Sequence, residues 1–566
     1  MLRGRDWLAG CRRRRLSEGA ARVAAAGQAW WFRVLLRAEA AKSQLAPVSP
    51  WARGTAGGDD GGSWGFLWKP AVLGLVALTA IAAGASLPSS PFKLEMAGTW
   101  FFGVPSTVDG PAVQTNLLVG LVAVYGGLVL LARVWFKLLR ALSERPGVPV
   151  RYLGMILALW LVPMLLVPPV FSRDVFSYAA QGEMMSRHIN PYVYGPGTLG
   201  SGPFVNPVDP LWMNTPAPYG PLFLMIDGFF ATLSFHNELL TVVMLRLLAL
   251  GGTLLVAWCV PKLAEASGRD VGPVYVMAVL NPLVLLTLVG AAHNDALMVG
   301  LLVAGVTAAK RGRPVAGIVL CALAAAVKAP AALGVLYIGW EWLGPGLPLR
   351  QRVRPVLTAG MLAAGVMVLV TVVSGLGFGW VANLETPGTV RSWLAPATGA
   401  GLALSGLAHV VGVGVSQAGM LSVTRVLGLL TASAVAVYLL VRSERVGSLR
   451  SMGLSLLLFV ILGPVVQPWY LTWGIVVLAA VASGRLRAVL VLFSVAVPFI
   501  GLTGGHTLLH QMATSDPLAV MAASIVLLAV ALVPLGRWGV ATRVRRAAAE
   551  AEEAEEAWSQ PALAFE

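Results

Sequence analysis

Residues 116–134 read NLLVGLVAVYGGLVLLARV and hold one charged residue, Arg133, near their end. A run of about 18 apolar residues is long enough to cross the roughly 30 Å hydrocarbon core of a bilayer as a helix. Only helices and closed barrels satisfy their backbone hydrogen bonds in lipid, and barrel strands alternate apolar with polar residues. Because the apolar residues here are continuous, the segment is predicted to be a transmembrane helix.

Comparable apolar runs recur along most of the chain. Of its 566 residues, 57% are hydrophobic and only 12% are charged, whereas a soluble domain carries about 25% charged residues. This composition excludes an ordinary soluble fold and predicts an all-α polytopic membrane protein with about 14 transmembrane helices. The predicted spans are residues 70–87, 116–134, 150–170, 238–260, 272–291, 294–309, 314–328, 330–343, 355–375, 420–441, 449–466, 469–482, 486–503 and 517–535.

The net charge of +15 is concentrated in short connections between the apolar runs. With these connections on the cytoplasmic side the predicted spans alternate across the membrane, so the charge indicates orientation and not nucleic-acid binding. Two further apolar stretches, 220–236 and 398–416, would break this alternation if each crossed alone. We expect both to be re-entrant or interfacial amphipathic helices on the outer side. The alternative is that one of them crosses and a neighbouring span does not.

Both ends of the chain differ from its apolar body. Residues 1–65 are rich in Arg, Ala and Gly and are expected to be a basic, disordered cytoplasmic arm without a cleavable signal peptide. Residues 66–540 are expected to form one transmembrane catalytic domain, and residues 541–566 a charged cytoplasmic tail. The cysteines are isolated, so no disulfide framework is expected.

The predicted topology brings polar side chains from separate segments to the outer side. Ionisable groups at membrane depth usually mark a functional cavity. The first of them is Asp174, which directly follows a predicted span beside Arg173 and precedes an amphipathic stretch. Its carboxylate could take a proton from a hydroxyl group, or it could be an ordinary cap of a surface helix.

A second polar group lies in the turns between later spans. His293, Asn294 and Asp295 form a compact hydrogen-bonding cluster that could bind a phosphate, and a self-capping turn would explain only one of the three. One His and one Asp are too few to predict a metal site. Lys328 lies between two short apolar helices and either reaches water or binds an anion such as a phosphate.

Aromatic, amide and guanidinium groups gather in the outer loops and turns, including the segments NPYVYGP at 190–196 and TPAPYGP at 215–221. Such groups suit carbohydrate, because rings stack on CH faces and polar groups bind hydroxyls. The alternative is an interfacial belt of aromatic anchors. The candidate residues of this kind are Tyr192, Tyr219, Arg391, Trp393, Gln467, Trp469 and Tyr470.

The sequence has no P-loop, dinucleotide fingerprint, zinc-ligand spacing or Ser-His-Asp motif. A reaction driven by a cytoplasmic nucleotide therefore has no visible machinery. We expect the energy of the reaction to come with the substrate, and no cofactor is predicted.

The ordered set of motifs resembles the GT-C superfamily of polyprenyl-phosphate-sugar-dependent glycosyltransferases. The resemblance is closest to the actinobacterial polyprenol-phosphomannose-dependent α-(1→6)-mannosyltransferases of lipomannan synthesis, and it extends over residues 66–540. The matching segments are SRDVFSYAAQG at 172–182, NPY at 190–192, YGPL at 219–222, NP at 281–282, HNDA at 293–296, Lys328, RSW at 391–393 and QPWYLTW at 467–473.

The resemblance implies a GT-C-like helix bundle in the plasma membrane. Such an enzyme transfers a mannosyl residue from a polyprenyl-phosphate-linked donor to a glycolipid mannan on the outer face, forming an α-(1→6) linkage with inversion. In this superfamily an acidic residue in the first large outer loop is the catalytic base, and Asp174 is the matching position. No second acid pairs with it in sequence, so a divalent cation is unsupported.

The resemblance also implies roles for the other polar residues. Lys328, His293 and Arg173 would bind the donor phosphate. Asn294, Asp295 and the aromatic, amide and guanidinium residues named above would bind substrate. We expect Asp174, the turns at 293–295 and 467–470, Lys328 and Arg391 to line one outward-facing cavity.

Other functions share part of this pattern. Another lipid-linked-sugar transferase, or a glycan polymerase or ligase, would have the same outer-facing site. A transporter of lipid-linked sugars would favour charges near the midplane and an inverted repeat, and neither is evident. A structural scaffold would not need costly charges gathered on one side.

Overall fold

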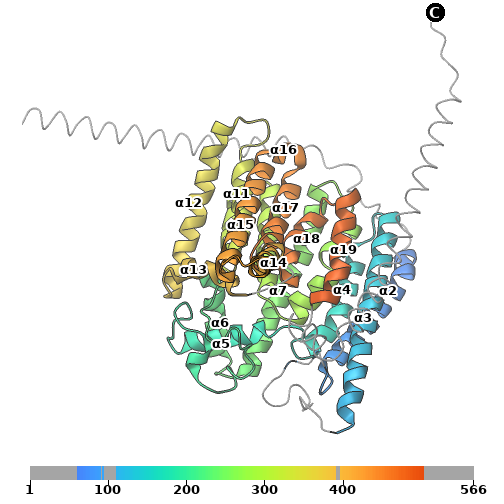
Figure 1. The fold of residues 1–566 in the computed structure, drawn as a ribbon. Coiled ribbons are helices and arrows are strands. Elements are labelled where there is room, and N and C mark those ends of the chain that lie inside the picture. Colours follow the sequence, from blue (N-terminus) through green and yellow to red (C-terminus); the bar gives the residue numbers. More distant parts are fainter. Residues whose placement is uncertain (1–59, 91, 93, 95–109, 391–394, 502–566) are drawn as a thin grey trace, which may run out of the picture.

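The computed structural model describes residues 60–90, 92, 94, 110–390 and 395–501 (Figure 1). Within these residues the chain is helical throughout, without a strand, as predicted. The predicted tail 541–566, the predicted span 517–535 and all but the end of the predicted arm 1–65 lie outside the described residues.

The first three helices form one packed group, to the right in Figure 1. They are α2 (Asp60–Ser86), α3 (Ala112–Glu144) and α4 (Val150–Leu166). A Cβ atom on Gly127 of α3 would lie 2.8 Å from the carbonyl oxygen of Ala77 in α2, so these two backbones touch. Trp160 of α4 donates from its indole N–H to the carbonyl of Ala71, at 3.0 Å. Small residues and such bonds join helices in lipid, where water provides no driving force.

The centre of the bundle is built from helices with buried glycines. They are α7 (Glu238–Ala266), α8 (Val271–Ala278), the π-helix η3 (Val284–Gly290), α9 (Asp295–Lys310) and α10 (Pro314–Ala325). A Cβ atom on Gly252 of α7 would lie 2.4 Å from the backbone of Ala296 in α9. A Cβ atom on Gly305 of α9 would lie 2.7 Å from the carbonyl of Gly317 in α10. Because α7, α9 and α10 pack this closely, the ends of α9 are held firmly.

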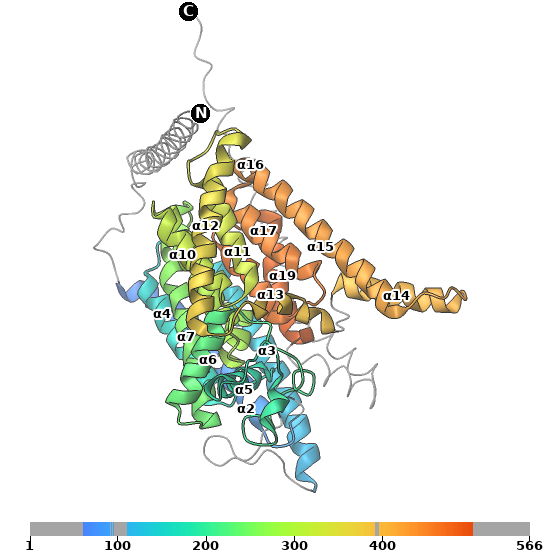
Figure 2. The same ribbon diagram turned by 90° about the vertical axis from the view of Figure 1, so that its left-hand side faces the viewer.

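The remaining helices complete the bundle. They are η4 (Ala329–Ala331), α11 (Ala332–Glu341), α12 (Leu349–Ser374), α13 (Gly379–Ala382), η5 (Asn383–Thr389), α14 (Pro396–Val410), α15 (Gln417–Val441), α16 (Ser443–Val446), α17 (Ser448–Ile461), η6 (Pro468–Tyr470), α18 (Leu471–Ala479) and α19 (Gly484–Gly501). Figure 2 shows α14 projecting sideways from one end of α15, away from the bundle.

A helical hairpin covers the end of the bundle that lies opposite α16 (Figure 1). It consists of α5 (Asp174–Ser186) and α6 (Pro221–Leu233), and the loop between them contains the short η2 (Pro196–Leu199). A Cβ atom on Gly182 of α5 would lie 2.4 Å from the carbonyl oxygen of Asp227 in α6. This close packing, which needs glycine, places the start of α5 over the central helices.

Helix length supports part of the predicted topology. Five described helices, α2, α3, α7, α12 and α15, are long and apolar enough to cross a membrane, and η3 with α9 would make a sixth as a bent pair. The shorter apolar helices have 10–17 residues, so the predicted total of about 14 spans is not established by length. The stretches 220–236 and 398–416 form α6 and α14, with 13 and 15 residues. Their position relative to a bilayer stays a prediction.

The predicted span 272–291 is interrupted in the structure. Between α8 and η3, the Asn281 side chain accepts from the Leu283 N–H at 3.0 Å and donates to the carbonyl of Met277 at 2.9 Å. It also donates to Ser494 Oγ in α19, at 2.7 Å. Asn281 therefore stabilises a break and joins two helices. A second break follows, where η3 and α9 meet at a bend of 116°.

Candidate active site

Asp174 is the first residue of α5, at the end of a short link from α4. Its backbone N–H donates to Ser172 Oγ in that link, at 3.2 Å. The N-cap residue Arg173 makes no capping bond through its side chain, and the first N–H of α5 is bonded to Ser172 and not to the Asp174 carboxylate. The carboxylate is 16% exposed, and its Oδ2 lies 3.5 Å from Nε2 of the fully buried His293. The structure thus brings together two residues that the sequence placed in separate motifs.

The hydrogen bonds of His293 determine which nitrogen carries a proton. Nδ1 lies 2.7 Å from the carbonyl oxygen of Thr287, which can only accept, so Nδ1 is the protonated nitrogen of the neutral ring. Nε2 lies 3.2 Å from Ser172 Oγ and accepts from that hydroxyl. If Nε2 gains a proton, the ring becomes a cation facing Asp174. The two side chains can therefore hold one additional proton between them.

An aromatic layer covers His293. The Trp469 indole stacks on the imidazole with ring centroids 3.8 Å apart and an interplanar angle of 22°. Trp469 belongs to η6, and the neighbouring Tyr470 packs edge-on against it, with centroids 5.9 Å apart. The turn at 467–470 therefore meets the turn at 293–295. The stack restricts the plane of the His293 ring and shields one face of it from water.

Lys328 forms a buried ion pair with Asp295. Its Nζ lies 3.0 Å and 2.9 Å from the two carboxylate oxygens, and the side chains are 12% and 0% exposed. Trp473 donates from its indole N–H to the same carboxylate, at 2.5 Å. The sequence predicted only water or a bound anion as partners of Lys328. This pair was not predicted, because Asp295 lies 33 positions away along the chain.

Aromatic faces surround the Lys328 ammonium group. Its Nζ lies 4.4 Å from the ring centroid of Tyr470, 5.5 Å from that of Trp473 and 5.9 Å from that of Tyr219. Cation–π attraction operates within about 6 Å of a ring centroid. Tyr470 and Trp473 also stack on each other, with centroids 4.6 Å apart. The charge is thus held between one carboxylate and three rings.

The loop before α6 supports this arrangement. Gly220 donates to the carbonyl of Val327 at 3.0 Å, which places Tyr219 beside the lysine. The Tyr192 hydroxyl donates to the carbonyl of Tyr219 at 2.9 Å, so this tyrosine supports the loop. Burial, and then the negative charge of Asp174, raises the pKa of Tyr219 well above its ordinary value. Its hydroxyl therefore stays protonated and can donate to a ligand.

A cavity of about 1140 Å³ is lined in part by Lys328. The three rings around its ammonium group, Tyr219, Tyr470 and Trp473, line the cavity with it. Its apolar walls come from α11, α15 and α17, through Leu333, Leu336, Leu421, Val426, Leu429, Phe459 and Val460. Residues of η5 add polar groups, namely Asn383, Glu385 and Thr386.

Only part of the predicted cluster borders this cavity. Among the described residues, Asp174 and His293 do not line it. They connect to its lining through Trp469, which stacks on His293 and packs edge-on against Tyr470. Lys328 therefore lines the cavity, whereas Asp174 and His293 lie outside its lining and are joined to it through Trp469 and Tyr470.

The other predicted residues vary in their placement. Asn294 is 3% exposed, and both polar atoms of its amide lack a hydrogen-bond partner within the described part of the chain. Gln467 is the half-buried N-cap residue of η6, and Arg173 is half-buried beside Asp174. Arg391 and Trp393 lie outside the described residues. In residues 60–90, 110–390 and 395–501 there is no group of three or more His, Cys, Asp or Glu that could hold a metal ion.

Sequence reasoning missed three residues of the site: Ser172, Tyr178 and Trp473. Ser172 bonds to His293, and Trp473 bonds to Asp295. Tyr178 packs edge-on against Tyr219, with centroids 5.1 Å apart. All three lie inside the motifs quoted above, but their side chains gave no separate signal, because Ser, Tyr and Trp are common at helix ends in membranes.

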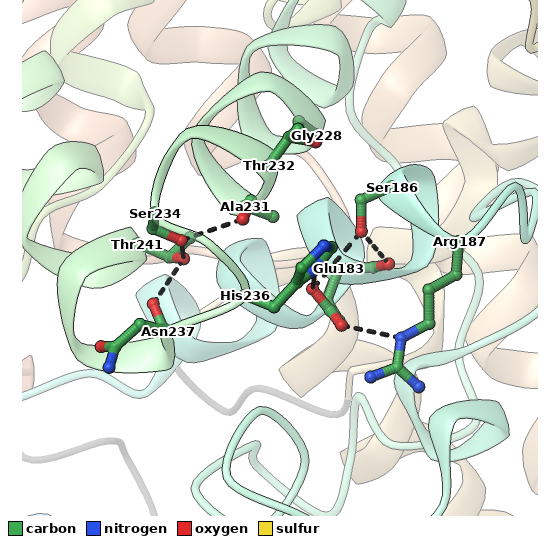
Figure 3. Close-up of polar contacts among 10 residues, drawn as sticks. All are labelled: Glu183, Ser186, Arg187, Gly228, Ala231, Thr232, Ser234, His236, Asn237 and Thr241. Carbon is green, nitrogen blue, oxygen red and sulfur yellow. Dashed lines mark hydrogen bonds and ion pairs between the residues drawn. The ribbon is translucent and has the colours of Figure 1, made fainter.

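The far end of α5 is anchored by Glu183 (Figure 3). This carboxylate is 1% exposed and accepts from Arg187 Nε at 2.7 Å. Its second oxygen lies 2.8 Å from His236 Nδ1, in the turn between α6 and α7. His236 adopts a left-handed backbone with φ of +58°, which is uncommon for a residue with a Cβ atom. Glu183 therefore holds α5 against the turn that leads into α7.

Fold and site together define a class of protein. The body is all helical and apolar, and it gathers a carboxylate, a histidine and a lysine at the ends of its helices, as expected of a membrane-embedded glycosyltransferase. Residues 71–344 match the family model "Alpha-(1->6)-mannopyranosyltransferase, N-terminal domain", and residues 397–545 match "MptB C-terminal domain". The chain belongs to the alpha-(1→6)-mannopyranosyltransferase family.

Individual proteins of similar sequence have the same family name. A probable alpha-(1→6)-mannopyranosyltransferase of Mycolicibacterium smegmatis is 33% identical over 67% of this chain and 76% of its own length. An alpha-(1→6)-mannopyranosyltransferase of Mycobacterium tuberculosis is 31% identical over 80% of this chain and 87% of its own. Alpha-(1→6)-mannopyranosyltransferase A of the same organism is 35% identical over 58% and 64%. No solved structure matches. The chain is a mannosyltransferase, and the identification made from its motifs is confirmed.

Proposed function

We propose that the enzyme transfers a mannosyl residue from a polyprenyl-phosphate-linked donor to a hydroxyl of a glycolipid mannan, on the outer face of the membrane and with inversion. The observation that carries this proposal is the cavity of about 1140 Å³ with Lys328 in its lining and apolar walls along α11, α15 and α17. A phosphate joined to a long hydrocarbon chain has the matching distribution of charge and apolar surface.

The donor would lie with its phosphate at Lys328 and its chain along the apolar walls. An ammonium group has three donors, and Asp295 accepts two hydrogen bonds from Lys328, which leaves one for a phosphate oxygen. Each CH₂ group moved from water onto apolar surface contributes about 0.8 kcal/mol. The prenyl chain would therefore supply much of the affinity, and the lysine would select the anionic head.

Asp174 would act as general base. It takes the proton from the acceptor hydroxyl while that oxygen forms a bond to the anomeric carbon. The bond from this carbon to the phosphate oxygen breaks, and the polyprenyl phosphate leaves as an anion that needs no acid. The proton stays on Asp174 or moves to His293, whose Nε2 lies 3.5 Å away. These contacts favour His293 as a partner of Asp174 over the phosphate-binding role expected from sequence, while Arg173 remains a candidate for that role.

Inversion is supported by the separate contacts that Asp174 and Lys328 make. A single displacement needs the attacking hydroxyl and the leaving phosphate on opposite faces of the sugar. Asp174 meets the layer of Trp469 and Tyr470 through His293, which stacks on Trp469, whereas Lys328 meets it at the ring of Tyr470. A mannosyl ring placed at the edge of this layer would turn one face toward Asp174 and the other toward Lys328. The free amide of Asn294 would bind a sugar hydroxyl.

The outer location is supported by the distribution of charge. Basic residues lie at the opposite ends of the site helices, for example Lys310 at the end of α9. The positive-inside rule assigns that end to the cytoplasm. Polar residues of η5 at the cavity would face the polar head of the donor.

The test is mannosyl transfer in membranes that contain Asp174→Asn, with a polyprenyl-phosphate mannose donor and a mannan glycolipid acceptor. We expect a rate at least about a hundredfold below the unchanged enzyme, because loss of a general base typically costs about 10²–10⁴-fold. The matched control is Asp209→Asn, an outer-loop acid whose carboxylate accepts from Leu211 N–H at 2.9 Å. Transfer by Asp174→Asn at the control rate would remove Asp174 from the mechanism.

The mass of the product separates this function from its alternatives. A transferase adds one mannosyl unit per turnover, a ligase moves a block of sugars, and a transporter moves the donor unchanged. A lengthened acceptor with an α-(1→6) bond, and polyprenyl phosphate released in equal amount, is the expected result.

A further inference from the structure

Arg246 is a buried arginine in α7, only 4% exposed. Its guanidinium group donates hydrogen bonds to backbone carbonyls of two different segments. The carbonyls of Leu165 and Val167 accept from Nη1, the first at 3.4 Å, and that of Gly290 accepts from Nη2 at 3.0 Å. Leu165 is in the last turn of α4, Val167 is the C-cap of that helix, and Gly290 is the last residue of η3. One side chain therefore joins the ends of two helices.

These two helix ends lead directly to the reacting side chains. The link after Val167 continues to Asp174, and the turn after Gly290 continues to His293. The Gly290 carbonyl also accepts from the N–H of Val170, at 3.1 Å, so the link and the turn are joined to each other as well as to α7. Beyond this junction, Asp174 Oδ2 and His293 Nε2 lie 3.5 Å apart.

The chemistry of arginine suits this junction. The last carbonyls of a helix lack intrahelical donors and carry negative partial charge. A planar guanidinium can bond to several of them at fixed angles, whereas a lysine ammonium acts as a single flexible point. Burying a charge costs several kcal/mol before its hydrogen bonds compensate. An apolar side chain would fill the same space at less cost, which argues for a role in geometry.

We propose that Arg246 is a positioning residue, which holds the ends of α4 and η3 together so that Asp174 stays within reach of His293. This inference rests on the proposed function, because it takes Asp174 and His293 as the pair that receives the acceptor proton. A displacement of about 1 Å can reduce the rate about a hundredfold in an enzyme site. The hydrogen bonds of Arg246 would limit such a displacement of Asp174 relative to His293, although Arg246 itself lies outside the site.

The first experiment measures kcat and KM for Arg246→Lys and Arg246→Met. We expect Arg246→Lys to lower kcat about tenfold with little change in KM for the donor, because the contacts of Lys328 are untouched. The matched control is Arg352→Lys. Arg352 is also 4% exposed and donates to the carbonyls of Trp340 and Leu347, at the opposite end of the bundle. Its replacement should lower the melting temperature similarly and leave kcat unchanged.

A double-mutant cycle with His293→Gln separates positioning from general stability. If Arg246 acts through the geometry of Asp174 and His293, Arg246→Lys should change kcat less than about twofold once His293 is replaced. A full tenfold loss in that background, or equal loss of kcat in Arg246→Lys and Arg352→Lys, would overturn the proposal. If Arg246→Met does not fold, Arg246→Lys still provides the test.

The experiments give different results if Asp174 is not the general base and if Arg246 is not a positioning residue. Asp174→Asn at the rate of the unchanged enzyme would refute the role of Asp174, whereas the cycle reports coupling between Arg246 and His293. An additive cycle together with an inactive Asp174→Asn would refute only the positioning role.

Discussion

Two helices of this enzyme, α9 and α11, have an acid–lysine pair at each of their ends. At one end Asp295, the first residue of α9, pairs with Lys328 just before α11, and the side chains are 0% and 12% exposed. At the other end Lys310, the last residue of α9, pairs with Glu341 of α11, and they are 32% and 37% exposed. The N–O distance is 2.9 Å in both pairs. The same chemical pair is thus seen in two environments.

Burial distinguishes the pair at the candidate site from the pair at the other end of the helices. A partly exposed pair contributes about 0–1 kcal/mol and has little effect on its surroundings. A buried pair carries a desolvation cost of several kcal/mol per ion, so it is weak evidence for stability. Rings of Tyr470, Trp473 and Tyr219 surround the buried lysine, which also lines the large cavity. Removing solvent there makes its charge strong toward a ligand.

The largest expected difference between the ends is in the reaction rate. Lys328→Met should reduce mannosyl transfer about a hundredfold, because it removes the fixed charge that faces the leaving phosphate. Lys310→Met should leave the rate within about twofold, since its pair is partly solvated. Initial rates at saturating acceptor test this, and Lys328→Arg should recover part of the loss. Equal rates in the two methionine variants would contradict a role of the Lys328–Asp295 pair in mannosyl transfer.

The next largest difference is in stability. Asp295→Asn leaves the buried lysine without its carboxylate, and we expect a loss of about 3 kcal/mol in the free energy of unfolding. Glu341→Gln removes the corresponding acid from the exposed pair and should cost less than about 1 kcal/mol. Thermal unfolding of both variants in the same detergent measures the comparison. A smaller decrease in melting temperature for Asp295→Asn than for Glu341→Gln would contradict this prediction. It would show that the buried Lys328 charge does not depend on the Asp295 carboxylate.

The smallest expected effect concerns the third partner of the buried pair. Trp473→Phe keeps an aromatic ring beside Tyr470 but loses the N–H that donates to Asp295 at 2.5 Å. The loss of one hydrogen bond to a charged group, about 2 kcal/mol, should slow transfer several-fold. Trp135→Phe is the control, since its indole N–H donates to the carbonyl of Val276 at 2.9 Å, away from the site. That variant should lose stability and retain the full rate of transfer.

The sequence predicted the class of fold, and it singled out most of the polar residues that make up the candidate site. Asp174, the HND turn and Lys328 are conspicuous because each interrupts or borders a long apolar run, where a charge is costly. Their pairings could not be predicted in the same way. Lys328 meets Asp295, and His293 meets Asp174, only because helices distant in sequence pack at particular angles. The sequence shows which polar residues are unusual among apolar runs, but it does not show which of them are in contact.

The number of spans was the weaker part of the prediction, again for a physical reason. Hydropathy measures how far apolar composition extends and does not register a bend or a break within it. The predicted spans 314–328 and 330–343 correspond to α10 and α11, which have 12 and 10 residues. Asn281 belongs to one of the segments that carry the family resemblance. In the structure its side chain closes the break between α8 and η3 and bonds to Ser494.

The winding of η3 has a consequence for how easily this site could be lost. This π-helix has seven residues, 284–290, and a π turn contains one more residue than an α turn. Deleting one of residues 288–290 would shorten the six-residue step over which the Thr287 carbonyl oxygen meets His293 Nδ1. We expect the imidazole of His293 to lose this bond, and with it the orientation that brings Nε2 to Asp174. A single-codon deletion of an apolar residue would therefore lower activity although every polar residue of the enzyme remains encoded.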